Sequence, residues 1–130
     1  MSTVLVVDDD IGIRHLASLV LRLDGNKVCT ASDGLEALDL LSHERVDLVI
    51  MDLRMPHMDG REAIREARRE GYEGPVIILS AFGALAAAEE LLADDALEKP
   101  FDPDELVSHV HGLLDPRDPA DSRKSSHRHK

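Results

Sequence analysis

Near its middle the sequence reads Leu48-Val49-Ile50-Met51-Asp52, four apolar residues followed by a carboxylate. A short apolar run of this kind is typical of a strand that is buried on both faces of a parallel sheet. In an open α/β sheet, ligands bind beyond the carboxyl ends of the strands, so an acid at this point is well placed for chemistry. Asp52 is therefore the first candidate functional residue.

Other apolar runs also lead to polar groups that could serve the same site. They are Val4–Val7 before Asp8-Asp9-Asp10, Val76–Leu79 before Ser80, and Ala96-Leu97 shortly before Lys99. Because parallel strands point their carboxyl ends to the same side of a doubly wound sheet, we expect these groups to converge with Asp52 on one edge.

Five β-prone runs alternate with five helical patterns, which indicates βαβ units and an α/β fold with a parallel sheet. We expect strands at residues 3–7, 27–31, 47–51, 75–79 and 95–97, and helices at residues 11–23, 34–43, 60–70, 84–93 and 102–114. Asp33, Asp59 and Asp102 each stand three residues before a Glu, the spacing of a capping box, and so predict three of the helix starts.

Composition limits the classes of function. With 130 residues the chain has the size of one domain, and its formal charge of -11, from 26 acids and 15 bases, argues against nucleic acid or an anionic membrane as the main partner. The single cysteine, Cys29, is interpreted as a buried strand thiol and suits a reducing compartment. No apolar run reaches the roughly 20 residues that a membrane span needs, so we expect a cytoplasmic protein.

The composition changes after residue 114. Residues 115–130 contain Pro, Ser, His and charged residues, with only Ala120 apolar. Such a segment cannot bury enough apolar surface to fold. We therefore expect a folded domain at residues 1–114 and a disordered polar tail at residues 115–130.

The polar residues at the strand ends predict a specific chemistry. Close carboxylates such as Asp8, Asp9 and Asp52 repel one another unless a hard cation joins them, and Mg²⁺ prefers oxygen ligands of this type. An aspartate beside such a metal can attack phosphorus covalently. Lys99 can then supply a fixed positive charge and Ser80 a hydroxyl group for the transferred oxygens.

Taken together, these residues resemble the receiver domain of two-component response regulators, over about residues 2–114. The family hallmarks are the acidic pair Asp8-Asp9, the acceptor Asp52 within Asp52-Leu53-Arg54-Met55-Pro56-His57-Met58-Asp59-Gly60, the hydroxyl residue Ser80, and Lys99-Pro100-Phe101. The resemblance implies a flavodoxin-like, doubly wound parallel sheet of five strands in the order 2-1-3-4-5, flanked by five helices.

The resemblance also assigns roles around a metal. It implies that Asp52 accepts a phosphoryl group from a phosphohistidine on a sensor histidine kinase or phosphotransfer protein. Asp9 and Asp52 would bind Mg²⁺ directly, together with the backbone carbonyl of Arg54, and Asp8 would act mainly through water.

For the remaining hallmarks, the resemblance implies that Lys99 pairs with the phosphate or the acceptor and that Ser80 moves to hydrogen-bond a phosphate oxygen. It further implies a cis peptide bond between Lys99 and Pro100. One position departs from the family, which usually has Tyr or Phe three residues before the lysine, where this chain has Ala96. Phe82 could take part of that role, but a plain loop or interface residue is the favoured interpretation.

The predicted function is that of a stand-alone receiver, similar to chemotaxis regulators, that switches contacts with a downstream protein target. We expect neither direct DNA binding nor a membrane partner, and we expect a phosphoacceptor rather than a multiple-turnover enzyme. Two alternatives remain. One is a metal-dependent aspartyl-phosphate phosphohydrolase, although Asp8-Asp9-Asp10 lacks the following Thr or Val and the chain has no cap insertion. The other is a phosphorylation-independent adaptor, which Ala96 suggests.

Simpler interpretations apply to several nearby residues. Asp10 and Asp59 are expected to cap helices, and His57 is expected to be a surface group. The mixed charges of residues 61–70 are expected to form a solvated helix face with pairs at i and i+4. By the resemblance, a phosphotransfer partner would contact the Pro100-Phe101 loop and the first helix near Ile11, Ile13, Arg14 and Leu16.

Overall fold

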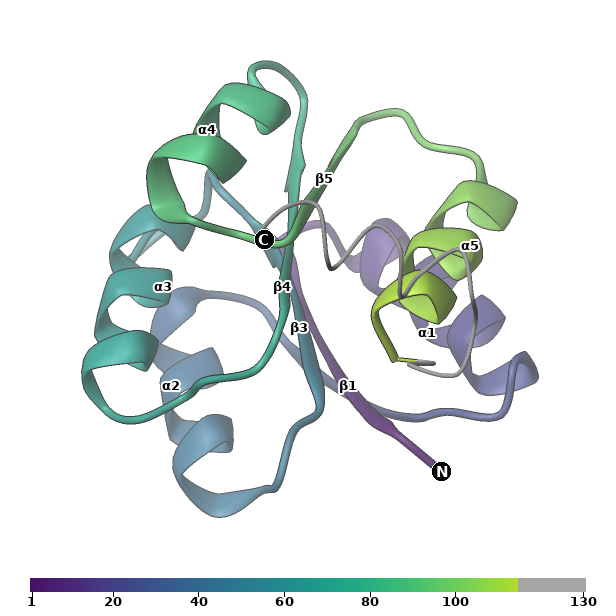
Figure 1. The fold of residues 1–130 in the computed structure, drawn as a ribbon, viewed down its shortest axis with the longest axis horizontal. Helices are drawn as coiled ribbons and strands as arrows, with labels where there is room; N and C mark the ends of the chain where they lie inside the picture. Colours follow the sequence, from purple (N-terminus) through teal and green to yellow (C-terminus); the bar gives the residue numbers. More distant parts are fainter. Residues whose placement is uncertain (115–130) are drawn as a thin grey trace.

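The computed structural model describes residues 1–114 and contains ten alternating elements (Figure 1). They are β1 (Thr3–Val7), α1 (Ile11–Leu23), β2 (Lys27–Ala31), α2 (Gly34–His43), β3 (Leu48–Asp52), α3 (Gly60–Arg69), β4 (Val76–Ser80), α4 (Ala84–Leu91), β5 (Asp95–Glu98) and α5 (Pro103–Leu114). Every expected strand and helix is present, with shifts of one or two residues at some ends. The predicted tail at residues 115–130 lies outside the described part.

All five strands are parallel and follow the order β2-β1-β3-β4-β5, as predicted. The strands β3 and β4 each begin and end one residue later than expected. Asp52 and Ser80 are consequently the last residues of their strands, and both belong to the sheet itself.

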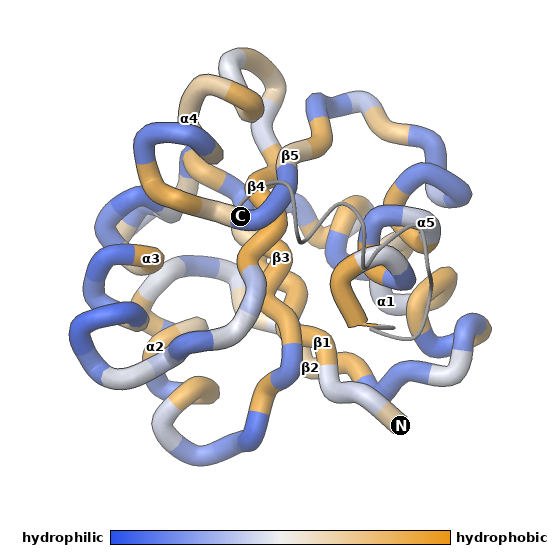
Figure 2. Tube along the Cα trace, viewed as in Figure 1, coloured by the Kyte–Doolittle hydropathy of each residue, from blue (hydrophilic) through white to orange (hydrophobic). Residues whose placement is uncertain are grey.

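The sheet lies between two layers of helices. Helices α2, α3 and α4 cover one face, and α1 and α5 cover the other (Figure 1). Alternate residues of the same strand enter the two cores: in β1, Leu5 and Val7 face the first layer, whereas Val4 and Val6 face the second. Figure 2 shows the strands as a hydrophobic centre, with hydrophilic stretches on the outer sides of the helices.

The predicted helix caps are confirmed. Asp33 accepts a hydrogen bond from the backbone N–H of Glu36 at 2.9 Å, and Asp59 accepts one from Glu62 at the same distance. Asp102 caps the backbone N–H of Asp104 at 2.8 Å. These bonds satisfy amide groups that have no partner inside the helix, and so they fix where α2, α3 and α5 begin.

The charges of α3 follow the prediction only in part, because Glu66 and Arg69 pair within the helix, at i and i+3. Arg61 and Arg65 both reach Glu90 on α4, at 2.7 Å and 3.3 Å, so these pairs join two helices instead of two turns of one helix. Only neighbouring helices in the folded chain can make such a contact, and sequence spacing does not reveal it. Within residues 1–114, none of the helices is long and apolar enough to span a membrane.

Candidate functional site

The strand register brings the predicted site residues to one edge of the sheet. Val7, the last residue of β1, pairs with Met51, so Asp8 and Asp52 follow side by side. Ser80 ends β4 opposite Glu98, and Lys99 is the next residue after β5. The parallel ladder continues into the site, because the backbone N–H of Lys99 donates to the carbonyl of Ser80 at 2.8 Å.

Three carboxylates form the centre of this edge. Asp8, Asp9 and Asp52 each offer one oxygen, and these oxygens lie within 4.8 Å of one another. Asp8 is 0% exposed and Asp52 is 4% exposed, whereas Asp9 is open to solvent. Two buried acids at such short range need a positive charge beside them.

Lys99 supplies part of that charge. Its Nζ atom lies 2.8 Å from Oδ2 of Asp8 and 3.2 Å from Oδ1 of Asp52, and its side chain is only 18% exposed. Burial by itself would lower the pKa of Lys99, but the two carboxylates outweigh this effect and raise that pKa. Lys99 is therefore a fixed cation between the two buried acids. The peptide bond between Lys99 and Pro100 is cis, as expected.

The acids hold more negative charge than Lys99 balances. Burial, and next the charge of Asp8, raise the pKa of Asp52 to about 6. Oδ1 of Asp8 accepts a hydrogen bond from the backbone N–H of Asp10 at 3.0 Å. Its Oδ2 atom is buried and has the Lys99 ammonium, 2.8 Å away, as its charged partner. Three carboxylates whose negative charge one lysine offsets only in part fit a site for a divalent cation.

Ser80 and Arg54 lie beside the acids. The hydroxyl of Ser80 donates to the backbone carbonyl of Phe82 at 2.9 Å and accepts from the N–H of Phe82 at 3.3 Å. Arg54, in the loop after β3, lines with Ser80, Ala81 and Phe82 a hollow of about 260 Å³. The Phe82 side chain is 73% exposed, in agreement with its interpretation as a loop residue.

Ala96 lies in β5, where it pairs with Ile78 and packs against the core beneath α4. It is partly buried, and its methyl group cannot move as an aromatic ring would. The position where the family usually has an aromatic residue therefore lies inside the sheet, on the strand next to β4, which carries Ser80.

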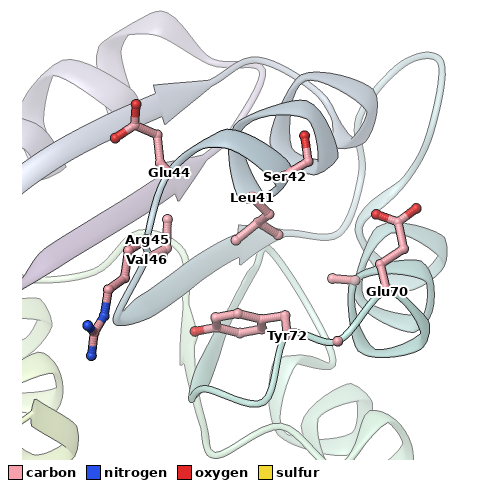
Figure 3. Close-up of a pocket in the computed structure, with 9 residues that line it drawn as sticks. Leu41, Ser42, Glu44, Arg45, Val46, Glu70 and Tyr72 are labelled. Carbon is pink, nitrogen blue, oxygen red and sulfur yellow. The ribbon is translucent and has the colours of Figure 1, made fainter.

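A second hollow, of about 300 Å³, lies between the ends of α2 and α3 (Figure 3). Leu41 and Tyr72 point into it, and Glu44 and Glu70 lie at its margin. The Tyr72 hydroxyl is already used, because it donates to the carbonyl of Pro75 at 2.8 Å. This hollow shares no residue with the acid cluster and is not part of the candidate site.

Two residues near the site have partners that the sequence did not indicate. Nη1 of Arg14, on α1, donates to the backbone carbonyl of Asp8 at 2.7 Å. Nδ1 of His57, in the loop after β3, lies 2.9 Å from the carboxylate of Asp33. The sequence does show that Arg14 is a cation close to the start of a helix, where the helix dipole disfavours a positive charge. That unusual position could have marked Arg14 as a residue with a specific partner.

The doubly wound parallel sheet, with a cluster of acids, a lysine and a hydroxyl group at its carboxyl edge, is the arrangement that the resemblance implied. The family model of the response regulator receiver domain matches residues 4–111. The chain belongs to this family, which confirms the resemblance.

Relatives and solved structures agree with this assignment. The chain is 37% identical over 125 residues to "Response regulator MprA" of Mycobacterium bovis, a match that covers 94% of the chain and 54% of the relative. It is 42% identical over 114 residues to "Probable transcriptional regulator ycf27" of Cyanophora paradoxa, covering 85% of the chain and 47% of the relative. The chain therefore spans about half the length of the curated relatives it matches.

Among solved structures, the chemotaxis protein CheY4 of Vibrio cholerae has a TM-score of 0.82 and 34% identity, over 88% of this chain and 99% of that one. The response regulator TrrA of Thermotoga maritima, solved in complex with Mg²⁺-BeF, has a TM-score of 0.78 and 35% identity, over 88% of this chain and 100% of that one. The flavodoxin-like fold expected from the sequence is thus confirmed.

Proposed function

We propose that this receiver domain accepts a phosphoryl group on Asp52 from a phosphohistidine of a sensor histidine kinase or phosphotransfer protein, and that the modification switches its contacts with a downstream protein. The observation that carries the proposal is the position of Asp52. Its carboxylate is 4% exposed at the end of β3, with the Nζ of Lys99 3.2 Å away and two further acids within reach.

The proposal includes Mg²⁺ as the cation of the acid cluster. The carboxylates of Asp8, Asp9 and Asp52, with the backbone carbonyl of Arg54, would hold it. When bound, the metal would neutralise charge on the acids and on the phosphoryl oxygens. The three clustered carboxylates, whose charge Lys99 offsets only in part, support this part of the proposal, and the related TrrA was solved with Mg²⁺-BeF.

The remaining residues act on the phosphoryl group itself. An oxygen of Asp52 forms a bond to phosphorus while the P–N bond of the donor breaks, and the electron pair leaves with the donor imidazole, which then takes up a proton. Lys99 lies close enough to Asp52 to offset the new negative charge. The hydroxyl of Ser80 would give up its bond to the carbonyl of Phe82 and donate to a phosphoryl oxygen.

In this proposal the domain is a stoichiometric acceptor, and it is not a multiple-turnover enzyme. The test is incubation of the protein with Mg²⁺ and a small phosphodonor, followed by intact-mass measurement. The wild type should gain one phosphoryl group, and Asp52→Ala should gain none. Asp39→Ala is the matched control, because Asp39 is an exposed acid on α2 that is not part of the acid cluster, and it should be labelled like the wild type.

The labelling experiment and two further assays separate the alternatives. Labelling of Asp52→Ala, or no labelling of the wild type, would contradict the proposal. Sustained turnover of a phosphomonoester would favour the phosphohydrolase instead. A pull-down that recovers the same partner with phosphorylated protein and with Asp52→Ala would favour the phosphorylation-independent adaptor.

A further inference from the structure

The guanidinium of Arg14 is bound to the backbone next to the acid cluster. Arg14 lies on α1, four residues after the helix cap Asp10, and its Nη1 donates to the backbone carbonyl of Asp8 at 2.7 Å. We propose that Arg14 is a positioning residue that orients Asp8 and Asp9 for the metal and for phosphoryl transfer. This inference rests on the proposed function.

The bonded oxygen belongs to the peptide group that joins the two acids. Because a peptide group is planar, the carbonyl of Asp8 and the N–H of Asp9 turn together. On the other side of Asp8, its backbone N–H donates to the carbonyl of Ala31 at 3.1 Å, as a continuation of the sheet ladder. The sheet thus fixes the peptide group before Asp8, and Arg14 fixes the one after it. Asp9 is exposed, so this bond is important for its orientation.

Further hydrogen bonds connect the same short segment to α1. The carboxylate of Asp8 accepts from the N–H of Asp10 at 3.0 Å, and the carboxylate of Asp10 caps the N–H of Gly12 at 2.8 Å. The backbone N–H of Arg14 donates to the carbonyl of Asp10 at 3.0 Å. Arg14 is therefore bonded to the segment between β1 and α1 twice, through its backbone N–H to Asp10 and through its guanidinium to Asp8.

Two effects oppose a cation at this location, although the negative charge of the neighbouring acids offsets them. A positive charge near a helix N-terminus opposes the helix dipole, and α2, α3 and α5 carry acids in their first turns where α1 carries none. A cation near a metal site also repels the metal. A residue that breaks local rules in this way is expected at a functional site, where a specific contact compensates. The short bond to the Asp8 carbonyl is that contact.

The test compares Arg14→Met, Arg14→Lys and Arg22→Met. Arg22 is the matched control, because it lies on the same helix and its Nη2 donates to the backbone carbonyl of Val28 at 3.3 Å, outside the acid cluster. Mg²⁺ binding is measured by titration calorimetry, the rate of labelling by a small phosphodonor is measured at saturating Mg²⁺, and thermal unfolding is followed in EDTA.

Arg14→Met should weaken Mg²⁺ binding about 10-fold, the effect typical of groups that orient metal ligands, and should slow labelling. Arg14→Lys should lie between Arg14→Met and the wild type, because lysine keeps the charge and one donor but loses the planar fork. Arg22→Met should bind Mg²⁺ like the wild type.

Three outcomes would overturn the inference. The first is Mg²⁺ binding by Arg14→Met that equals or exceeds that of the wild type, since charge repulsion would then be the only effect of Arg14. The second is equal weakening in Arg14→Met and Arg22→Met, which would indicate general destabilisation of α1. The third is weaker binding by Arg14→Lys than by Arg14→Met. If the wild type binds Mg²⁺ but is not labelled, the proposed function fails, and the calorimetric comparison still decides the role of Arg14.

Discussion

Replacing Asp52 by Asn should make the metal-free protein more stable at neutral pH. Burial, and next the charge of Asp8, raise the pKa of Asp52 from 3.8 to about 6. Folding therefore disfavours the ionised carboxylate, and the penalty is present in full above pH 6. A shift of about two pKa units corresponds to about 3 kcal/mol, which Asn avoids because it carries no charge. Lys99 keeps its contact with Asp8, 2.8 Å away, in the variant.

The sign of the pH dependence follows from the same shift. In the wild type, the free energy of unfolding should rise as the pH falls from about 7 through 6 towards 3.8, because the folded state takes up the proton first. The gain of Asp52→Asn over the wild type should shrink across the same window. Other groups also titrate in this range, so the measured quantity is the difference in the free energy of unfolding between the two proteins. It is obtained from urea unfolding in EDTA at pH 7.5, 6 and 5, values that bracket a pKa of about 6.

Addition of Mg²⁺ is the control for the role of Asp52 as a metal ligand. If Asp52 is a ligand, saturating Mg²⁺ should stabilise the wild type by about 2.7 kcal/mol at 100 times its dissociation constant, and should stabilise Asp52→Asn much less. The reasoning would be refuted if Asp52→Asn were no more stable than the wild type in EDTA at pH 7.5. It would also be refuted if the difference between the proteins did not change with pH.

Three further outcomes are expected. Lys99→Ala should lose about 3 kcal/mol of stability in urea unfolding and should not be labelled, because two buried carboxylates lose their cation. Gly60→Ala should be destabilised by about 3 kcal/mol in the same assay, since a Cβ there would lie 2.1 Å from the carbonyl oxygen of Asp52. Asp33→Asn should be less stable than the wild type above pH 4 and equal to it in stronger acid. The N–H of Glu36, and next His57, lower the pKa of Asp33, so the stability it provides is lost as the pH falls through that value.

The sequence predicts those parts of the fold that depend on local chemistry. The acids Asp33, Asp59 and Asp102 have short-range hydrogen-bond partners, so their spacing locates three helix starts to within one residue. The ends of the strands depend more on contacts between residues that are far apart in the sequence. Residue 47 was expected to begin the third strand, but its carboxylate accepts from the backbone N–H of Thr3 at 2.8 Å, and β3 begins one residue later.

In the candidate site, too, some features could be predicted from the sequence and others could not. Residues at the ends of parallel strands must converge, so the positions of Asp8, Asp52, Ser80 and Lys99 could be expected from order and spacing. The contacts that long side chains make with backbone atoms or with other helices could not be expected from the sequence. Arg14 could have extended into solvent, and only the folded distance of 2.7 Å to the Asp8 carbonyl shows what it binds.

The absence of an aromatic ring at Ala96 makes the bonds of Ser80 more important for the proposed switch. Its hydroxyl both donates to and accepts from the backbone of Phe82, so donation to a phosphoryl oxygen must break at least the bond to the Phe82 carbonyl. The loop then leads directly into α4, whose first residue follows Gly83, a glycine with φ of 75° and no side-chain cap. The other four described helices, α1, α2, α3 and α5, each have an aspartate that accepts a backbone hydrogen bond at this point. If the proposed function holds, a change at Ser80 reaches a helix start that has no such restraint, and we expect α4 to respond to phosphorylation without a ring in β5.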